Sequence, residues 1–160
     1  MIERVFTIGV YGRTEEQFFG ALAEAGIDTF CDIRQRRGVR GSQYAFVNSN
    51  RLQNSMAARG IEYRYFPELA PSKDVRASQH AFDAQRGVGK RTREELGEDF
   101  KYRYRAEILG KFDSNKFRQV FASRSRFIVF FCVEATAAAC HRSLVAERLQ
   151  HDWKIPIIHL

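Results

Sequence analysis

The sequence predicts a single α/β domain, residues 1–160, with a mostly parallel five-stranded sheet covered by helices. Short runs of β-branched and aromatic residues alternate with helical patterns along most of the chain, as in βαβ units. The run at residues 127–134 is apolar up to Glu134, which is typical of a strand buried on both faces. A chain of 160 residues suits one domain with a substantial core.

The first unit consists of a strand at residues 5–8, a turn at residues 9–13 and a helix. Thr14 begins the helix as part of a capping box, because Gln17 lies three residues on and can bond back to the cap amide. Apolar residues then recur at helical spacing until Gly26, which suits the left-handed end of a helix.

The second unit has a strand at residues 27–33, a polar loop at residues 35–48 and another helix. Asn48 or Ser49 can cap this helix, and Gly60 ends it.

The third strand, at residues 61–66, alternates between apolar and polar residues, which favours a place near an edge of the sheet. Residues 67–97 show only weak periodicity and carry several Gly and a basic run. We interpret them as a long basic insertion, since connections of that length usually carry a function or are mobile. A helix at residues 100–109 follows.

The last part of the chain begins with a helix capped by Asp113 or Ser114. The buried strand at residues 127–134 then leads through a short turn into a helix that begins near Cys140. A final strand lies at residues 155–159, so that strands and helices alternate to the end.

Basic residues exceed acidic ones, giving a formal net charge of +7, and 20 of the 26 basic residues are Arg. Arg makes planar, bidentate contacts with phosphate and carboxylate groups. This composition favours a polyanionic partner or a phosphorylated substrate. Ordinary solubilising charge is the alternative interpretation.

The compartment expected from the sequence is the cytoplasm. No apolar run reaches the ~18 residues of a membrane span, and the first residues lack a signal-peptide pattern. We therefore expect no membrane partner. Three cysteines, an odd number, favour reduced thiols over a disulfide framework.

Three turns carry most of the reactive and charged residues: residues 9–13, 32–40 and 134–142. Parallel strands place every such turn at the same sheet edge, where ligands bind in open α/β folds. We therefore expect these turns to meet and form the site at the carboxyl edge of the strands.

The same turns contain a recognisable set of motifs. They are Thr7-Ile8-Gly9 with Arg13, Asp32-Ile33-Arg34, Cys132-x-Glu134 and Cys140-His141-Arg142. With them the chain resembles the bacterial and archaeal family known as domain of unknown function 488, from about residue 7 to residue 160. The family has a shared motif set and no settled reaction, so the resemblance implies which residues matter and not what they do.

These residues favour an enzyme-like site for a phosphate-bearing ligand, a nucleotide or a nucleic acid. Carboxylates at strand ends can act as acid and base, guanidinium groups beside helix starts can hold phosphate, and a thiol there can act as a nucleophile. Internal ion pairs, such as Asp32 with Arg142, and simple packing of the thiol are the structural alternatives. We assign catalytic roles to Asp32, Glu134, Cys140 and His141, and phosphate binding to Arg13, Arg34 and Arg142.

Basic residues interleaved with aromatic ones suit single-stranded or flipped-out nucleotides, which offer phosphates and stacking faces. A solvated helix face with core aromatics is the alternative. The residues assigned to nucleic-acid binding are Arg36, Arg37, Arg40, Tyr44, Lys90, Arg91 and Arg93.

A metal site built on Cys132, Cys140 and His141, with His159 as a fourth ligand, is a weaker hypothesis. The two cysteines are not spaced as in a zinc knuckle, and we expect adjacent side chains on a helix to diverge. We therefore assign no metal ligand, and we leave the cofactor and the oligomeric state open. The rival functions are a non-catalytic nucleic-acid-binding or regulatory module and a thiol or metal sensor.

Overall fold

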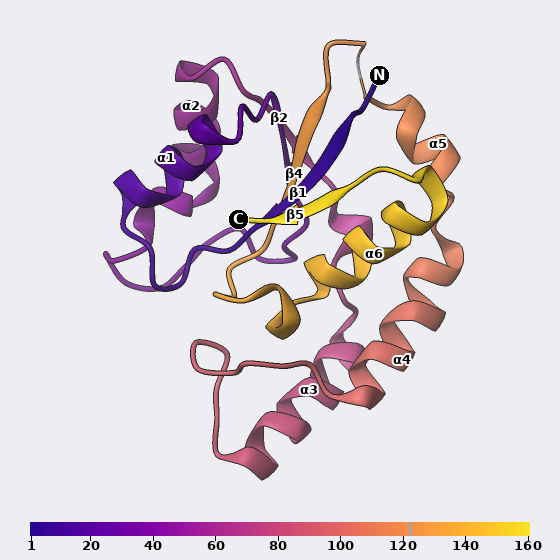
Figure 1. Ribbon diagram of the computed structural model, residues 1–160. Helices are drawn as coiled ribbons and strands as arrows, with labels where there is room; N and C mark the ends of the chain where they lie inside the picture. Colours follow the sequence, from indigo (N-terminus) through magenta and orange to yellow (C-terminus); the bar gives the residue numbers. More distant parts are fainter. Residues whose placement is uncertain (122) are drawn as a thin grey trace.

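The computed structural model describes residues 1–121 and 123–160, which form a five-stranded sheet with helices on both faces (Figure 1). All strand pairs are parallel, so the predicted α/β fold class is confirmed. The strands are Arg4–Ile8 (β1), Thr29–Asp32 (β2), Glu62–Tyr65 (β3), Phe127–Phe131 (β4) and Ile157–His159 (β5).

Strand β4 lies in the middle of the sheet, whose order is β3-β2-β4-β1-β5. Its side chains alternate between two cores, with Ile128 and Phe130 on one face and Val129 and Phe131 on the other. This burial on both faces explains the unbroken apolar run in the sequence. Strand β3 is at an edge, as its alternating pattern predicts.

The helices form two layers (Figure 1). The side chains of α1 and α2 pack in one core, and those of the other four helices pack in the second core on the opposite face. The helices are Glu15–Glu24 (α1), Ser49–Ala58 (α2), Lys73–Arg86 (α3), Glu98–Glu107 (α4), Ser114–Gln119 (α5) and His141–Trp153 (α6), with short 3-10 turns at Ala45–Val47, Pro67–Leu69, Leu109–Lys111 and Ala137–Ala139.

Helix α1 begins as the sequence predicts. The Thr14 side chain accepts a hydrogen bond from the Gln17 amide at 3.1 Å, and the Gln17 side chain accepts one from the Thr14 amide at 2.9 Å. This capping box satisfies two amides that the first turn would leave without partners.

Helix α3 occupies much of the segment expected to be one long connection, and that expectation is wrong for residues 73–86. The helix packs against α4, but its buried residues are Val75, Gln79 and Asp83. Two of these three are polar, so the buried stripe lacks the apolar periodicity by which helices are recognised. Gln79 instead donates to Asp83 at 2.8 Å and accepts from the Gly97 amide at 2.9 Å.

Three turns that are far apart in the sequence meet at the carboxyl edge of the sheet. The amides of Val10 and Tyr11 donate to the carbonyl oxygen of Val133 at 3.1 and 3.0 Å. The Nε2 atom of His141 lies 3.1 Å from the carbonyl oxygen of Ile33. The turns after β1, β2 and β4 are therefore joined directly to one another.

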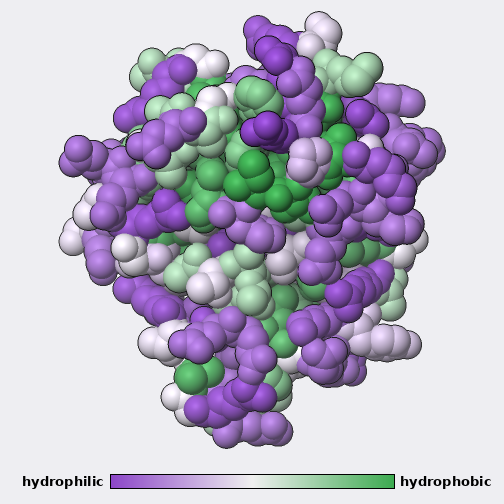
Figure 2. Space-filling view, in the orientation of Figure 1, coloured by the Kyte–Doolittle hydropathy of each residue, from purple (hydrophilic) through white to green (hydrophobic). Residues whose placement is uncertain are grey.

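The visible face of the molecule combines a hydrophilic surface with an apolar area over β1 and β5 (Figure 2). Ile158 of the edge strand β5 is 37% exposed. Within the described residues, no helix combines the length and the apolar character needed to cross a membrane.

The turn after β1 and the turn after β4 approach each other so closely that position 9 requires glycine. A Cβ there would overlap the Glu134 carbonyl oxygen and lie 3.1 Å from Nη2 of Arg142. We predict that Gly9→Ala lowers the free energy of unfolding by about 2 kcal/mol or more, because the backbone must move to accept the methyl group. Urea denaturation measures the change.

Gly20→Ala is the matched control, since nothing lies within 4 Å of the added methyl group in α1. Alanine is the better helix former, so this variant should be unchanged or more stable by up to about 1 kcal/mol. Equal effects at the two positions would contradict the close approach at Gly9.

Candidate functional site

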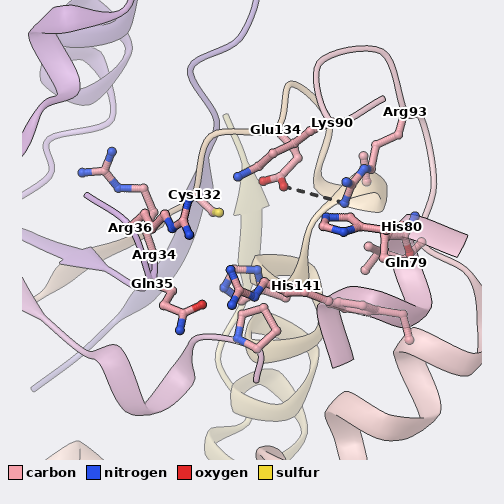
Figure 3. A pocket seen from close by; sticks show the side chains of 15 residues that line it. Arg34, Gln35, Arg36, Gln79, His80, Lys90, Arg93, Cys132, Glu134 and His141 are labelled. Atoms are coloured by element: carbon pink, nitrogen blue, oxygen red, sulfur yellow. Dashed lines mark ion pairs between the residues drawn. The ribbon is translucent and has the colours of Figure 1, made fainter. Parts of the chain in front are cut away.

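A cavity of about 250 Å³ opens where the turns after β2 and β4 face helix α3 and the segment that follows it (Figure 3). Five cationic side chains and one carboxylate line it, together with two imidazoles and an apolar wall. The charged lining residues are Arg34, Arg36, Arg76, Lys90, Arg93 and Glu134.

Asp32 and Arg34 form a buried ion pair at the end of β2. Nε and Nη2 of Arg34 donate to the two carboxylate oxygens of Asp32 at 2.9 and 2.7 Å. The Arg34 amide donates to Oδ1 of the same carboxylate at 3.1 Å, and the Tyr63 hydroxyl donates to Oδ2 at 2.6 Å. Burial, followed by the charge of Asp32, raises the pKa of Tyr63, which keeps this donor protonated. Asp32 thus positions Arg34, which lines the cavity while Asp32 does not.

Glu134 follows β4 and is buried, with only 5% of its surface exposed. Burial raises the pKa of its carboxyl group. Its Oε1 atom lies 3.9 Å from Nη1 of Arg93, while Nη2 of Arg93 bonds Asp83 at 2.8 Å. The Lys90 side chain, which comes from the same segment as Arg93, runs beside Glu134 (Figure 3).

Several buried polar atoms of the lining residues have no hydrogen-bond partner in the part of the chain that the structure describes. They are Nη1 of Arg34, Nε of Arg76, Nε of Arg93 and Oε2 of Glu134. Leaving such a group unsatisfied costs about 1–3 kcal/mol, and more where the group is charged. The residues that line the cavity therefore carry three donors and one acceptor that the described residues leave unsatisfied, which favours a polar ligand.

Arg142 is 1% exposed and does not line the cavity. Its Nη1 and Nη2 atoms donate to the carbonyl oxygens of Glu134 and Ala135 at 2.7 and 3.2 Å. The guanidinium therefore holds the connection between β4 and α6 in shape. The alternative pairing of Asp32 with Arg142 is wrong, because Asp32 bonds Arg34 instead.

Cys132, Cys140 and His141 come together beside the cavity, with one ligand-type atom from each within 4.8 Å of the others. All three are buried, and Cys132 and His141 line the cavity. Hydrogen bonding with Cys140, followed by burial, raises the pKa of Cys132 to about 11.

The expected divergence of Cys140 and His141 is wrong. Cys140 is the N-cap of α6 and has extended backbone angles, φ −141° and ψ 142°, so it is not part of the helix proper. Its sulfur lies 3.8 Å from Nδ1 of His141. The change of backbone conformation between the two residues brings the side chains together.

The residues assigned to nucleic-acid binding lie around the cavity mouth and beyond it. Three of them, Arg36, Lys90 and Arg93, line the cavity, and of these Arg36 and Lys90 are exposed. Arg91 lies 5.3 and 5.4 Å from the ring centroids of Tyr11 and Tyr44. It also donates to the carbonyl oxygen of Arg40 at 3.2 Å. The basic segments at residues 34–40 and 90–93 are therefore side by side.

Three other predicted residues make contacts away from the cavity. Tyr44 is buried and accepts a hydrogen bond from the Gly12 amide at 2.9 Å. Arg37 lies 4.1 Å from the ring centroid of Tyr65. Arg13 is half-buried in the turn after β1 and is not among the lining residues.

Helix α3 contributes three lining residues that were not predicted from the sequence: Arg76, Gln79 and His80. Their spacing places them on one helical face. Two residues mark the ends of this helix in the sequence. Ser72 caps its start by accepting a hydrogen bond from the Val75 amide, and Gly87 lies at its end.

A family model described as "Domain of unknown function DUF488" matches residues 14–149. This range includes every residue that lines the cavity. No curated protein and no solved structure matches the chain.

The burial of the Asp32–Arg34 pair leads to a stability prediction. Asp32→Ala should lower the free energy of unfolding by about 3–5 kcal/mol, because it leaves the Arg34 charge buried without its partner. In the control, Glu147→Ala removes an exposed pair with Arg105 and should cost at most about 1 kcal/mol. Urea denaturation compares the two variants, and similar small losses would contradict the structural role of Asp32.

Proposed function

The chain belongs to the DUF488 family, and we propose that its cavity is an enzyme-like site for a phosphate-bearing ligand, a nucleotide or a nucleic acid. The observation that carries the proposal is that three arginines that line the cavity, Arg34, Arg76 and Arg93, each have a buried guanidinium nitrogen with no partner among the described residues. An anion with several oxygen atoms would offer hydrogen-bond acceptors to these arginines.

Phosphate suits this arrangement better than a single carboxylate does. Arg34 and Arg93 are each held from behind by an aspartate, so their remaining nitrogens keep fixed directions. Several fixed donors match the several oxygens of a phosphate group, and the exposed cations Arg36 and Lys90 add attraction at the entrance.

A nucleotide fits the rest of the cavity. Pro71, Leu96 and Phe100 line it beside the charged groups and offer apolar contacts for a sugar or a base. A volume of about 250 Å³ suits one small ligand rather than a length of strand. Within a nucleic acid, a single terminal or flipped-out nucleotide would therefore enter the cavity. The exposed cations at its entrance, Arg36 and Lys90, would hold the neighbouring phosphates.

Glu134 would act as the acid or base of the reaction. It lines the cavity, and its Oε2 atom is a buried acceptor with no partner among the described residues, so the carboxylate would bind a ligand hydroxyl or a water molecule, as a general base does. Asp32 would act by positioning Arg34. Cys140 and His141 would form the corner of the site next to Glu134.

A non-catalytic nucleic-acid-binding or regulatory module is the second candidate. The contact of Arg91 with the Arg40 carbonyl and with two tyrosine rings favours it, because these contacts place basic residues together beyond the lining of the cavity. Glu134→Gln separates the two candidates: an enzyme loses turnover and keeps binding, whereas a binding module shows no turnover in either form.

Ligand binding is tested by thermal stabilisation with nucleotides and short oligonucleotides. A ligand that binds the folded chain raises Tm, and the increase should shrink from low to moderate salt because phosphate contacts are screened. Absence of any increase at low salt would overturn the proposal.

Lys90→Ala should weaken the affinity for the ligand found in that screen by about fivefold, on the order of 1 kcal/mol. Lys116→Ala is the control, since Lys116 is exposed on α5 and does not line the cavity. Titration of both variants gives the two dissociation constants. An equal loss in both would indicate general charge attraction rather than binding in the cavity.

A further inference from the structure

The cluster of Cys132, Cys140 and His141 has a composition and geometry that phosphate binding does not use. Cys132 directly follows β4, Cys140 is the N-cap of α6, and His141 is the first residue of that helix. The three side chains are buried at the junction of two regular elements, which fixes their relative positions. Two sulfurs and an imidazole within 4.8 Å form a set of soft donor atoms.

We propose that these three residues bind a thiolate-preferring divalent cation, zinc foremost. Around a tetrahedral zinc ion, with zinc–sulfur and zinc–nitrogen bonds of about 2.3 and 2.0 Å, a thiolate sulfur and an imidazole nitrogen lie about 3.5 Å apart. The distance from Cys140 Sγ to His141 Nδ1 is 3.8 Å. This pair of ligand atoms therefore needs only a small adjustment to coordinate the ion, and the Cys132 sulfur lies within 4.8 Å of the other two ligand atoms.

The second nitrogen of His141 supports this assignment. Nε2 lies 3.1 Å from the Ile33 carbonyl oxygen, which can only accept, so Nε2 carries the proton and donates. The lone pair is then on Nδ1, the nitrogen that faces Cys140. A metal-binding histidine held from behind by a carbonyl oxygen is a common second-shell arrangement.

The site provides three protein ligands, which is the number typical of catalytic zinc sites with one coordination position left for water or substrate. Cys132 and His141 line the cavity, and so does Glu134, whose Oε2 atom is buried and has no partner among the described residues. Glu134 would therefore accept a hydrogen bond from a molecule at the fourth position, or complete the coordination itself.

The charge of the cluster fits a divalent cation as well. Two thiolates and a neutral imidazole offset the charge of the ion, so a neutral unit would occupy this buried position. The inference depends on these three residues alone and stands whether or not a phosphate ligand enters the cavity.

The first experiment uses the full chain and zinc alone. Protein purified under reducing conditions is freed of metal with a chelator, incubated with excess Zn²⁺ and dialysed, and its metal content is then measured by mass spectrometry. We expect about one zinc per chain and a higher Tm, because the ion binds the folded state. Zinc content near zero after dialysis would overturn the proposal.

Variants identify the ligands. Cys132→Ala and Cys140→Ala should each weaken zinc binding by more than about 100-fold, since loss of a second-shell partner alone costs 10–100-fold. Cys31→Ala is the matched control, because Cys31 is also a buried free thiol but packs in the core on the other face of the sheet. Zinc binding equal in all three variants would refute the assignment.

A spectroscopic measurement on the wild-type chain covers the case in which a variant does not fold. Co²⁺ substituted for zinc should give a tetrahedral spectrum with strong thiolate-to-cobalt charge-transfer absorption. Absence of that absorption would overturn the proposal, and so would a Cys132–Cys140 disulfide in protein purified under reducing conditions.

Discussion

The buried guanidinium of Arg142 holds together the connection on which the whole carboxyl edge depends. From the first turn of α6, it donates hydrogen bonds to two successive carbonyl oxygens, those of Glu134 and Ala135. Because Gly9 carries no side chain, the turn after β1 can rest against the same carbonyl group. The positions of Glu134, Cys132 and Cys140 follow from this packing, so a residue with no place in the cavity determines the shape of one of its walls.

The cations at this edge fall into two groups with different physical roles. Arg34 and Arg93 are buried and each bonds an aspartate, which offsets the cost of removing the charge from water. Arg36 and Lys90 are exposed, so water and salt screen them. In the proposed site, the first group would orient a bound anion, and the second would increase the rate at which the anion associates.

Much of the fold could be predicted from the sequence, because the strands and most helices bury apolar residues with the expected period. The family was also recognisable from its motifs. Helix α3 could not be predicted because its buried stripe includes Gln79 and Asp83. The partner of Asp32 depends on side-chain conformations that spacing does not encode. The convergence of Cys140 and His141 depends on one extended residue ahead of a helix, which residue types alone do not specify.

The polar attachment of α3 has a thermodynamic consequence. Gln79 bonds a carboxylate and a backbone amide, and Asp83 bonds Arg93, so much of the contact between this helix and the molecule is made by polar atoms. Exposing polar surface lowers the heat capacity of a protein, whereas exposing apolar surface raises it. Detaching α3 would therefore carry a smaller heat-capacity change per residue than detaching α1, whose buried residues are phenylalanine and leucine. The free energy that holds α3 in place as a wall of the cavity should consequently vary less with temperature.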